Sequence, residues 1–146
     1  MSKQEIHYGR LIDHVHLVVK DIRASKTFYG AVLKALGHGF GREGEHFFEV
    51  DELFVSDEAY FDGKKDSTAP HRIHLAFQAP DHETVRRFYQ AAVAAGGAPN
   101  GEPGERDYHP GYFGAFVLDP DGNNIEAICH GQTQRSAESV VSSYDA

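Results

Sequence analysis

Three side chains that are able to bind a metal ion stand at positions whose spacing predicts that they meet. Glu126 lies inside the apolar segment 124–129 (NIEAIC), where period-two alternation gives it a different face from its two neighbours. A carboxylate on a buried face needs a compensating partner, because an unpaired buried charge is costly. His14 and His74 each lie near the start of a strand-like segment. Two imidazoles and one carboxylate on rigid strands make a facial triad with positions open for substrate, water or dioxygen.

An internal repeat relates the two histidines. A constant offset of 60 residues, without gaps, aligns the following pairs: His14 with His74, Asp21 with Asp81, Phe28-Tyr29 with Phe88-Tyr89, Ala31 with Ala91, Ala35 with Ala95, and Gly37 with Gly97. The match extends over strand, helix cap, helix and helix end, which indicates a duplicated unit rather than a chance similarity of two helices. His16 shares a face with His14 and is the rival candidate, but its repeat partner is Ala76. The repeat therefore favours His14.

Each copy is expected to contain one strand, one helix and three further short strands. In the first copy we expect a strand at 11–19, a helix from its N-cap Asp21 to Gly37, and strand pieces at 39–42, 45–50 and 53–56. In the second copy we expect a strand at 73–79, a helix from its N-cap Asp81 to Gly96-Gly97, a loop at 99–111, and strands at 113–118 and 124–129 around the turn Asp119-Pro120-Asp121-Gly122.

The chain length and composition fit one compact domain. It has 146 residues, of which 40% are hydrophobic, enough for a substantial core. We expect a single domain over 1–146, with a first module at about 9–60, a linker at about 61–71, a second module at about 72–130 and a polar tail at 131–146. Between the modules, the segment 57–72 is charged and contains Gly and Pro, as connections do.

Charge and cysteine content exclude several classes of function. The net charge is −8 without a basic cluster, which argues against a nucleic-acid or anionic-membrane surface. No stretch is long enough to span a membrane, and the N-terminal segment lacks the apolar region of a signal peptide. The single cysteine excludes an intrachain disulfide, so a reducing, cytoplasmic location is expected.

Three segments resemble the vicinal oxygen chelate superfamily, which includes glyoxalase I, extradiol dioxygenases and the fosfomycin- and bleomycin-resistance proteins. They are 13–37 (DHVHLVVKDIRASKTFYGAVLKALG), 73–97 (IHLAFQAPDHETVRRFYQAAVAAGG) and 115–130 (AFVLDPDGNNIEAICH). The resemblance implies an α+β fold of two tandem βαβββ modules, forming a curved, partly open mixed β-barrel with the helices outside. It places metal ligands at His14, His74 and Glu126. An acidic ligand closing the first module, as in glyoxalase I, is missing, because segment 53–55 is apolar. Glu49 is better explained by solvent exposure or hairpin pairing, and Cys129 by the core. His130 shares the face of Glu126 but lies at the end of the strand, where a surface role fits at least as well as ligation.

The resemblance implies a divalent-metal-dependent enzyme that binds a small substrate through adjacent oxygens, with lyase, isomerase or oxygenase chemistry. His2Glu accepts Fe2+, Mn2+, Zn2+, Ni2+ and Co2+, so the metal stays unresolved. In segment 99–112, His109 and Tyr112 are candidate catalytic residues and Arg106 and Tyr108 candidate substrate-binding residues; the alternative is a loop scaffold with solvated tips. A metal-free protein that sequesters a small molecule is the alternative function. A homodimer is expected, and His14 can come from the same or a neighbouring subunit.

Overall fold

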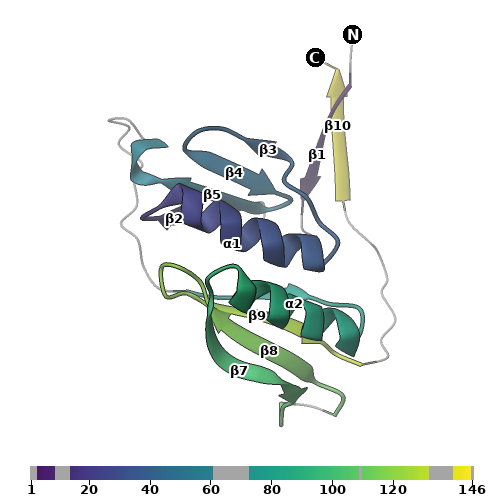
Figure 1. Cartoon of the computed structure of the whole chain (residues 1–146). Helices are drawn as coiled ribbons and strands as arrows, with labels where there is room; N and C mark the ends of the chain where they lie inside the picture. The colour runs from purple at the N-terminus through teal and green to yellow at the C-terminus, as the bar shows by residue number, and fades with distance from the viewer. Residues whose placement is uncertain (1–2, 9–13, 61–72, 109, 132–139, 146) are drawn as a thin grey trace.

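The computed structural model describes residues 3–8, 14–60, 73–108, 110–131 and 140–145. Within these ranges the two halves of the chain have the same architecture, and each half consists of a four-stranded mixed sheet and one helix (Figure 1). The predicted duplication and the α+β class are confirmed.

The first module has the strand order β2-β5-β4-β3, in which β2 is parallel to β5 and the other neighbours are antiparallel. Its elements are β2 (Val15–Val19), α1 (Ile22–Ala35), β3 (Arg42–Glu43), β4 (Phe47–Val50) and β5 (Leu53–Asp57), followed by a short 3-10 turn at Glu58–Tyr60. The strands and the helix follow the expected order, with boundaries shifted by a few residues, and the 3-10 turn lies in the segment expected as a connection.

The second module repeats this topology with the order β6-β9-β8-β7, in which β6 is parallel to β9. Its elements are β6 (His74–Gln78), α2 (His82–Ala94), β7 (Ala98–Glu105), β8 (Phe113–Leu118) and β9 (Asn124–Cys129). β9 lies between β6 and β8, so a side chain on β9 has a neighbouring strand on each side.

Both helices begin at the predicted caps. The Asp21 side chain accepts hydrogen bonds from the amides of Arg23 and Ala24 at 3.0 and 3.2 Å. The Asp81 side chain accepts one from the Thr84 amide at 2.7 Å. These bonds satisfy amide groups that have no partner inside the helix, which is why aspartate is favoured there.

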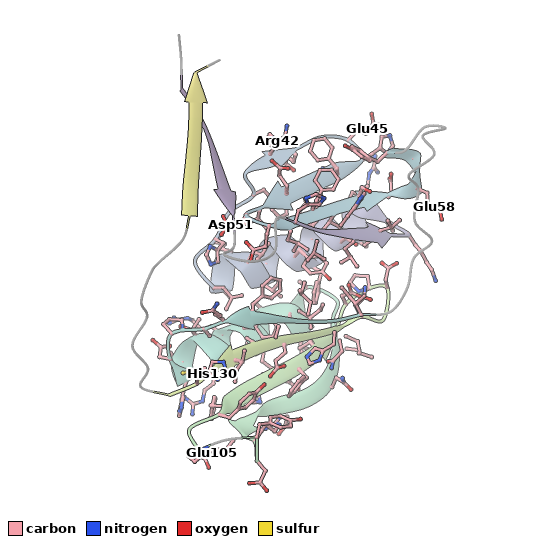
Figure 2. All side chains as sticks on the ribbon, turned by 180° about the vertical axis from the view of Figure 1, so that it is seen from behind. Arg42, Glu45, Asp51, Glu58, Glu105 and His130 are labelled. Atoms are coloured by element: carbon pink, nitrogen blue, oxygen red, sulfur yellow. The ribbon has the colours of Figure 1, made fainter. Side chains whose placement is uncertain are left out.

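One apolar core joins the two modules. Alternate residues of the inner strands, such as Leu17, Val55 and Ile125, are buried in it together with Phe28 and Phe88 of the two helices. The helices pack against each other and lie on the same side of both sheets (Figure 1). The opposite face of each sheet is therefore left for other side chains, as Figure 2 shows from behind.

The expectation of a loop over 99–111 is wrong for its first part, which is strand β7. β7 is an edge strand, and its pairing with β8 shifts register between Pro99 and Gly101 and again between Gly101 and Gly104. An edge strand tolerates proline and glycine because one side of its backbone needs no partner strand. Its Gly- and Pro-rich composition therefore reflects an irregular edge strand.

The two ends of the chain pair with each other. β1 (Lys3–Tyr8) and β10 (Val140–Asp145) form an antiparallel two-stranded sheet, from Lys3 opposite Asp145 to Tyr8 opposite Val140. The sequence predicts only a polar tail at 131–146 and no strand at the N-terminal end, because a pairing over such a sequence distance leaves no local signal. This ribbon is separate from the two four-stranded sheets (Figure 1).

Candidate functional site

Glu126 is a buried carboxylate on the face of the second sheet that points away from the core. Its neighbours Ile125 and Ala127 belong to the core cluster, so alternation along β9 turns Glu126 to the other face, as predicted. The Glu126 residue is nevertheless only 2% exposed. Its charge therefore has to be offset by neighbouring groups.

Two side chains from neighbouring strands and loops meet this carboxylate. His74 Nε2 lies 2.9 Å from Glu126 Oε1, and the Tyr112 hydroxyl donates a hydrogen bond to Oε2. The His74 side chain is 53% exposed, so the His74–Glu126 pair is reached from the solvent on the imidazole side. One imidazole nitrogen and one carboxylate oxygen, both on strands, make a pair of donors suited to a divalent cation.

Gly114 leaves the room that this carboxylate occupies. A Cβ atom at this position would lie 3.1 Å from Glu126 Oε2 and 3.4 Å from Tyr112 Cε1. Gly114 belongs to β8, the strand paired with β9. Gly114 is not among the predicted site residues, although an isolated glycine inside a strand signals a close approach by another group.

Tyr112 keeps its proton at neutral pH. Burial, followed by the hydrogen bond to Glu126 and the charge of that carboxylate, raises the pKa of Tyr112 well above its usual value of 10.0. The phenol therefore serves as a hydrogen-bond donor toward the carboxylate rather than as a proton acceptor.

The other predicted contact residues gather around this cluster. The ring of Tyr108, a residue that is 70% exposed, packs edge-on against Tyr112 at 4.8 Å. The Arg106 guanidinium lies 5.4 Å from the centroid of Phe116, whose ring is also 6.0 Å from His74. The fourth candidate, His109, lies outside the described residues.

His14 is not part of this cluster within one chain. It is exposed and directly precedes β2 in the first module. Over the described ranges, no group of three or more His, Cys, Asp or Glu side chains is placed to hold a metal ion. The structure thus brings together His74 and Glu126, and the third predicted ligand stays a prediction.

The first module has aromatic side chains where the second has its carboxylate. His16 is paired with Phe54, as Ala76 is paired with Glu126, so Phe54 is the structural counterpart of Glu126. The same registers make Phe47 the counterpart of Gly114. Phe47 and Phe54 stack at 5.4 Å. Duplication has therefore produced one carboxylate-containing face and one aromatic face.

The residues set aside in the sequence analysis have ordinary surroundings. Glu49 is paired with Arg42 across the β3–β4 hairpin, and Cys129 is buried in the core. His16 Nε2 lies 2.8 Å from the hydroxyl of Ser56. His130 is exposed, with its ring 5.7 Å from that of Tyr112.

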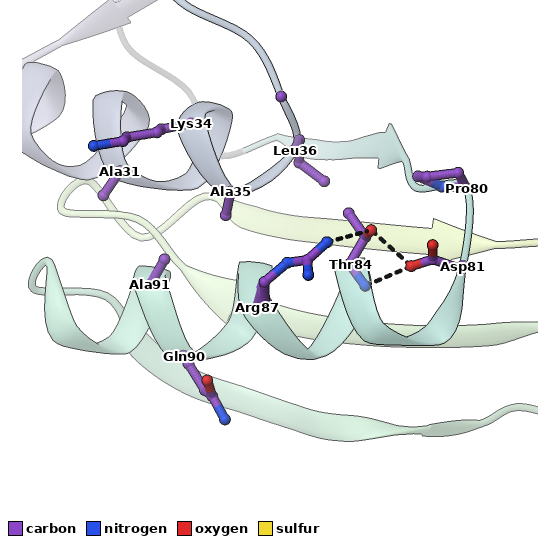
Figure 3. A pocket seen from close by; sticks show the side chains of 11 residues that line it. Ala31, Lys34, Ala35, Leu36, Pro80, Asp81, Thr84, Arg87, Gln90 and Ala91 are labelled. Atoms are coloured by element: carbon purple, nitrogen blue, oxygen red, sulfur yellow. Dashed lines mark hydrogen bonds between the residues drawn. The ribbon is translucent and has the colours of Figure 1, made fainter.

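A groove between the two helices lies away from this site. It has a volume of about 980 Å3, with Ala31 and Ala35 of α1 facing Ala91 and Arg87 of α2 (Figure 3). The Arg87 guanidinium donates a hydrogen bond to the Thr84 hydroxyl at 3.1 Å. None of the predicted site residues lines this groove.

Comparison with known proteins decides the family. Residues 11–127 match the Glyoxalase/Bleomycin resistance protein/Dioxygenase superfamily. The chain belongs to this superfamily. A structure of a glyoxalase/bleomycin resistance protein from Albidiferax ferrireducens is 32% identical, with a TM-score of 0.64 over 81% of this chain and 98% of that one. The recognition made from the sequence motifs is confirmed.

Two further relatives extend the comparison. The uncharacterized protein YqjT of Bacillus subtilis is 27% identical over 128 residues, which is 79% of this chain and 95% of YqjT. The structure of a lactoylglutathione lyase from Agrobacterium tumefaciens shares the fold, at 19% identity and a TM-score of 0.59 over 82% of this chain and 92% of the lyase. In the part of the chain that the structure describes, no helix has the length and apolar character that a membrane crossing requires.

Proposed function

We propose that this member of the superfamily is a divalent-metal-dependent enzyme that binds a small substrate through two adjacent oxygens. The observation that carries the proposal is the buried Glu126 carboxylate with the His74 imidazole nitrogen 2.9 Å from its Oε1. Both groups belong to strands of one sheet, and together they supply two of the three predicted ligands. Membership of a superfamily that generally binds a divalent metal supports the same assignment.

The third ligand in this proposal is His14. It is exposed and directly precedes β2. In this proposal His14 completes the ligand set from the same chain or from a neighbouring one. We infer a homodimer as the functional assembly, in which the sheets curve together into the partly open barrel that the family resemblance implies. The repeat supports His14 over His16, because the offset of 60 residues aligns His14 with His74 and His16 with Ala76.

The chain's own residues would hold and shape the site as follows. A divalent cation, when bound, supplies a Lewis acid that polarises the substrate's adjacent oxygens. Tyr112 holds its proton toward Glu126 and so fixes the orientation of the carboxylate. Tyr108 packs on Tyr112 and is 70% exposed, so in this proposal it would contact the substrate. His109 remains a candidate for proton transfer.

A metal-free binding protein is the second candidate, and one observation favours it. Both oxygens of Glu126 already have partners in the chain, His74 on Oε1 and Tyr112 on Oε2. The carboxylate is therefore compatible with burial in the absence of a cation. In this alternative the same face sequesters a small molecule without turning it over.

Manganese binding separates these two functions. Protein freed of bound metal with a chelator and then dialysed is titrated with Mn2+ and followed by electron paramagnetic resonance, for the wild type, Glu126→Gln and Glu49→Gln. Glu49 is a matched control, a strand glutamate paired with Arg42. We expect one site per chain in the wild type and in Glu49→Gln, and loss of that site in Glu126→Gln. Equal binding by all three proteins, or none by the wild type, would contradict the metal-dependent function.

A further inference from the structure

The Arg106 side chain is held in a defined position at the edge of the second sheet. Its guanidinium donates hydrogen bonds to the backbone carbonyls of Glu102 at 2.8 Å and Glu105 at 3.1 Å. The same group lies over the Phe116 ring, 5.4 Å from the centroid. The cation–π contact and the two backbone acceptors together hold the guanidinium in place.

Two glycines of β7 make room for this arrangement. A Cβ atom at Gly101 would lie 3.3 Å from Arg106 Nη2, and one at Gly104 would lie 3.2 Å from Nη1. Both glycines are at the register shifts of β7. The two glycines thus leave the space that the guanidinium occupies, and larger residues at these positions would crowd it.

The positive charge of Arg106 has no carboxylate partner among the described residues. Among the described arginines, Arg42 and Arg86 have glutamate oxygens within 4.0 Å, and Arg106 has none. A guanidinium has five N–H donors, and the two backbone carbonyls use two of them. The remaining donors are available to an anion, in a chain whose net charge is −8.

Arg106 belongs to the same face as the proposed metal site. The Phe116 ring under it also contacts the His74 ring, with 6.0 Å between the centroids. Phe116 is paired directly with Glu126, so both side chains point to one face of the sheet. Since adjacent strands are about 5 Å apart, the guanidinium lies on the order of one to two strand spacings from the carboxylate.

We propose that Arg106 binds a carboxylate of the substrate, at the end opposite to the two adjacent oxygens. The substrate class is then a small acid with a chelating head and a separate distal carboxylate. This inference rests on the proposed function for the position of the chelating head. A single guanidinium matches the charge and the two-oxygen geometry of a carboxylate, and a bidentate pair of this kind is among the stronger hydrogen-bonded contacts in proteins.

The test compares two probes that differ only in the distal group. 2-Oxoglutarate has a chelating 2-oxo acid head and a distal carboxylate, and 2-oxopentanoate has the same head and chain length without that carboxylate. Their affinities are measured by calorimetry on the Mn2+-loaded wild type, Arg106→Met and Arg86→Met. Arg86 is the matched control, because it also lies over a phenylalanine ring, 5.2 Å from the centroid of Phe113.

We expect the wild type and Arg86→Met to prefer 2-oxoglutarate, and Arg106→Met to bind it about 10-fold more weakly with little change for 2-oxopentanoate. An unchanged preference in Arg106→Met, or equal weakening for both acids, overturns the inference while Mn2+ binding continues to support the proposed function.

If the wild type binds no Mn2+, the proposed function fails, and the same titrations on metal-free protein decide whether Arg106 binds a carboxylate. A carboxylate preference that Arg106→Met removes then supports the anion site; no preference, or no binding of either acid, overturns it.

Discussion

Replacing Gly114 by alanine probes the candidate site with a single methyl group. The new Cβ would lie 3.1 Å from Glu126 Oε2, closer than ordinary van der Waals contact. Glu126 is 2% exposed and is held by Tyr112 and His74, so the carboxylate moves only by disturbing these two contacts. A displacement of a few tenths of an ångström exceeds the roughly 0.2 Å tolerance of metal–ligand distances.

Gly114→Ala is expected to affect stability and metal binding in opposite directions, with a small gain in the free energy of unfolding and a loss of metal affinity. Alanine in place of glycine in a strand stabilises by roughly 0.5–1 kcal/mol through lower entropy of the unfolded chain, and the contact with Glu126 offsets part of this gain. For a chain of 146 residues the melting temperature therefore changes by no more than about 4 °C. Misplacing a ligand by this amount lowers metal affinity about 10-fold, in the range found for perturbed surroundings of metal ligands.

The assay measures the Mn2+ dissociation constant and the melting temperature of the same samples. Gly39→Ala is the matched control, because a Cβ at Gly39 meets nothing within 4 Å. We expect Gly114→Ala to lose affinity about 10-fold with a nearly unchanged melting temperature, and Gly39→Ala to bind as the wild type does. Wild-type affinity in Gly114→Ala would refute the reasoning, because a ligand carboxylate this confined cannot accept the methyl group without cost.

Two further predictions concern the scaffold. Tyr29→Phe removes a buried hydrogen bond of 2.5 Å to Asp119 and is expected to cost about 1.5–3 kcal/mol in the free energy of unfolding measured in urea. Burial and Asp119 raise the pKa of Tyr29 well above 10.0, so the stability of the wild type falls as the pH rises above about 10. An equally steep alkaline loss of stability in the variant would contradict this. Asp81→Ala removes the α2 cap and is expected to lower the urea midpoint at pH 7. The Thr84 hydroxyl and amide lower the pKa of Asp81 below 3.8, so the difference in urea midpoint between variant and wild type fades as the pH falls below that value. A difference in midpoint that persists there would refute the role of the Asp81 carboxylate as the cap.

The repeat and the caps could be predicted because they depend on local signals. The aspartate caps and the alternating apolar residues each leave a pattern within one segment, and the constant offset is found by comparing two such segments. These elements form as expected. The direction of Glu126 followed from the same alternation. The hydrogen bonds of Glu126 to His74 and Tyr112 did not follow from it, because the sequence predicts His74 as a second metal ligand and Tyr112 as a catalytic residue.

The remaining features depend on pairing between distant segments. The β1–β10 ribbon joins the two ends of the chain, and β7 contains glycine and proline because it is an irregular edge strand. The Arg106 position likewise needs the register shifts of β7, which place Gly101 and Gly104 beside the guanidinium. None of these has a signature in a single window of sequence.

A crystal structure of Mn2+-soaked protein, with anomalous scattering to locate the ion, tests the central claim most directly. We predict one anomalous peak per chain within about 2.0–2.3 Å of His74 Nε2 and a Glu126 carboxylate oxygen, with a His14 imidazole of the same or a neighbouring chain as the third ligand. A peak elsewhere, or no peak while His74 remains hydrogen-bonded to Glu126, would contradict the account.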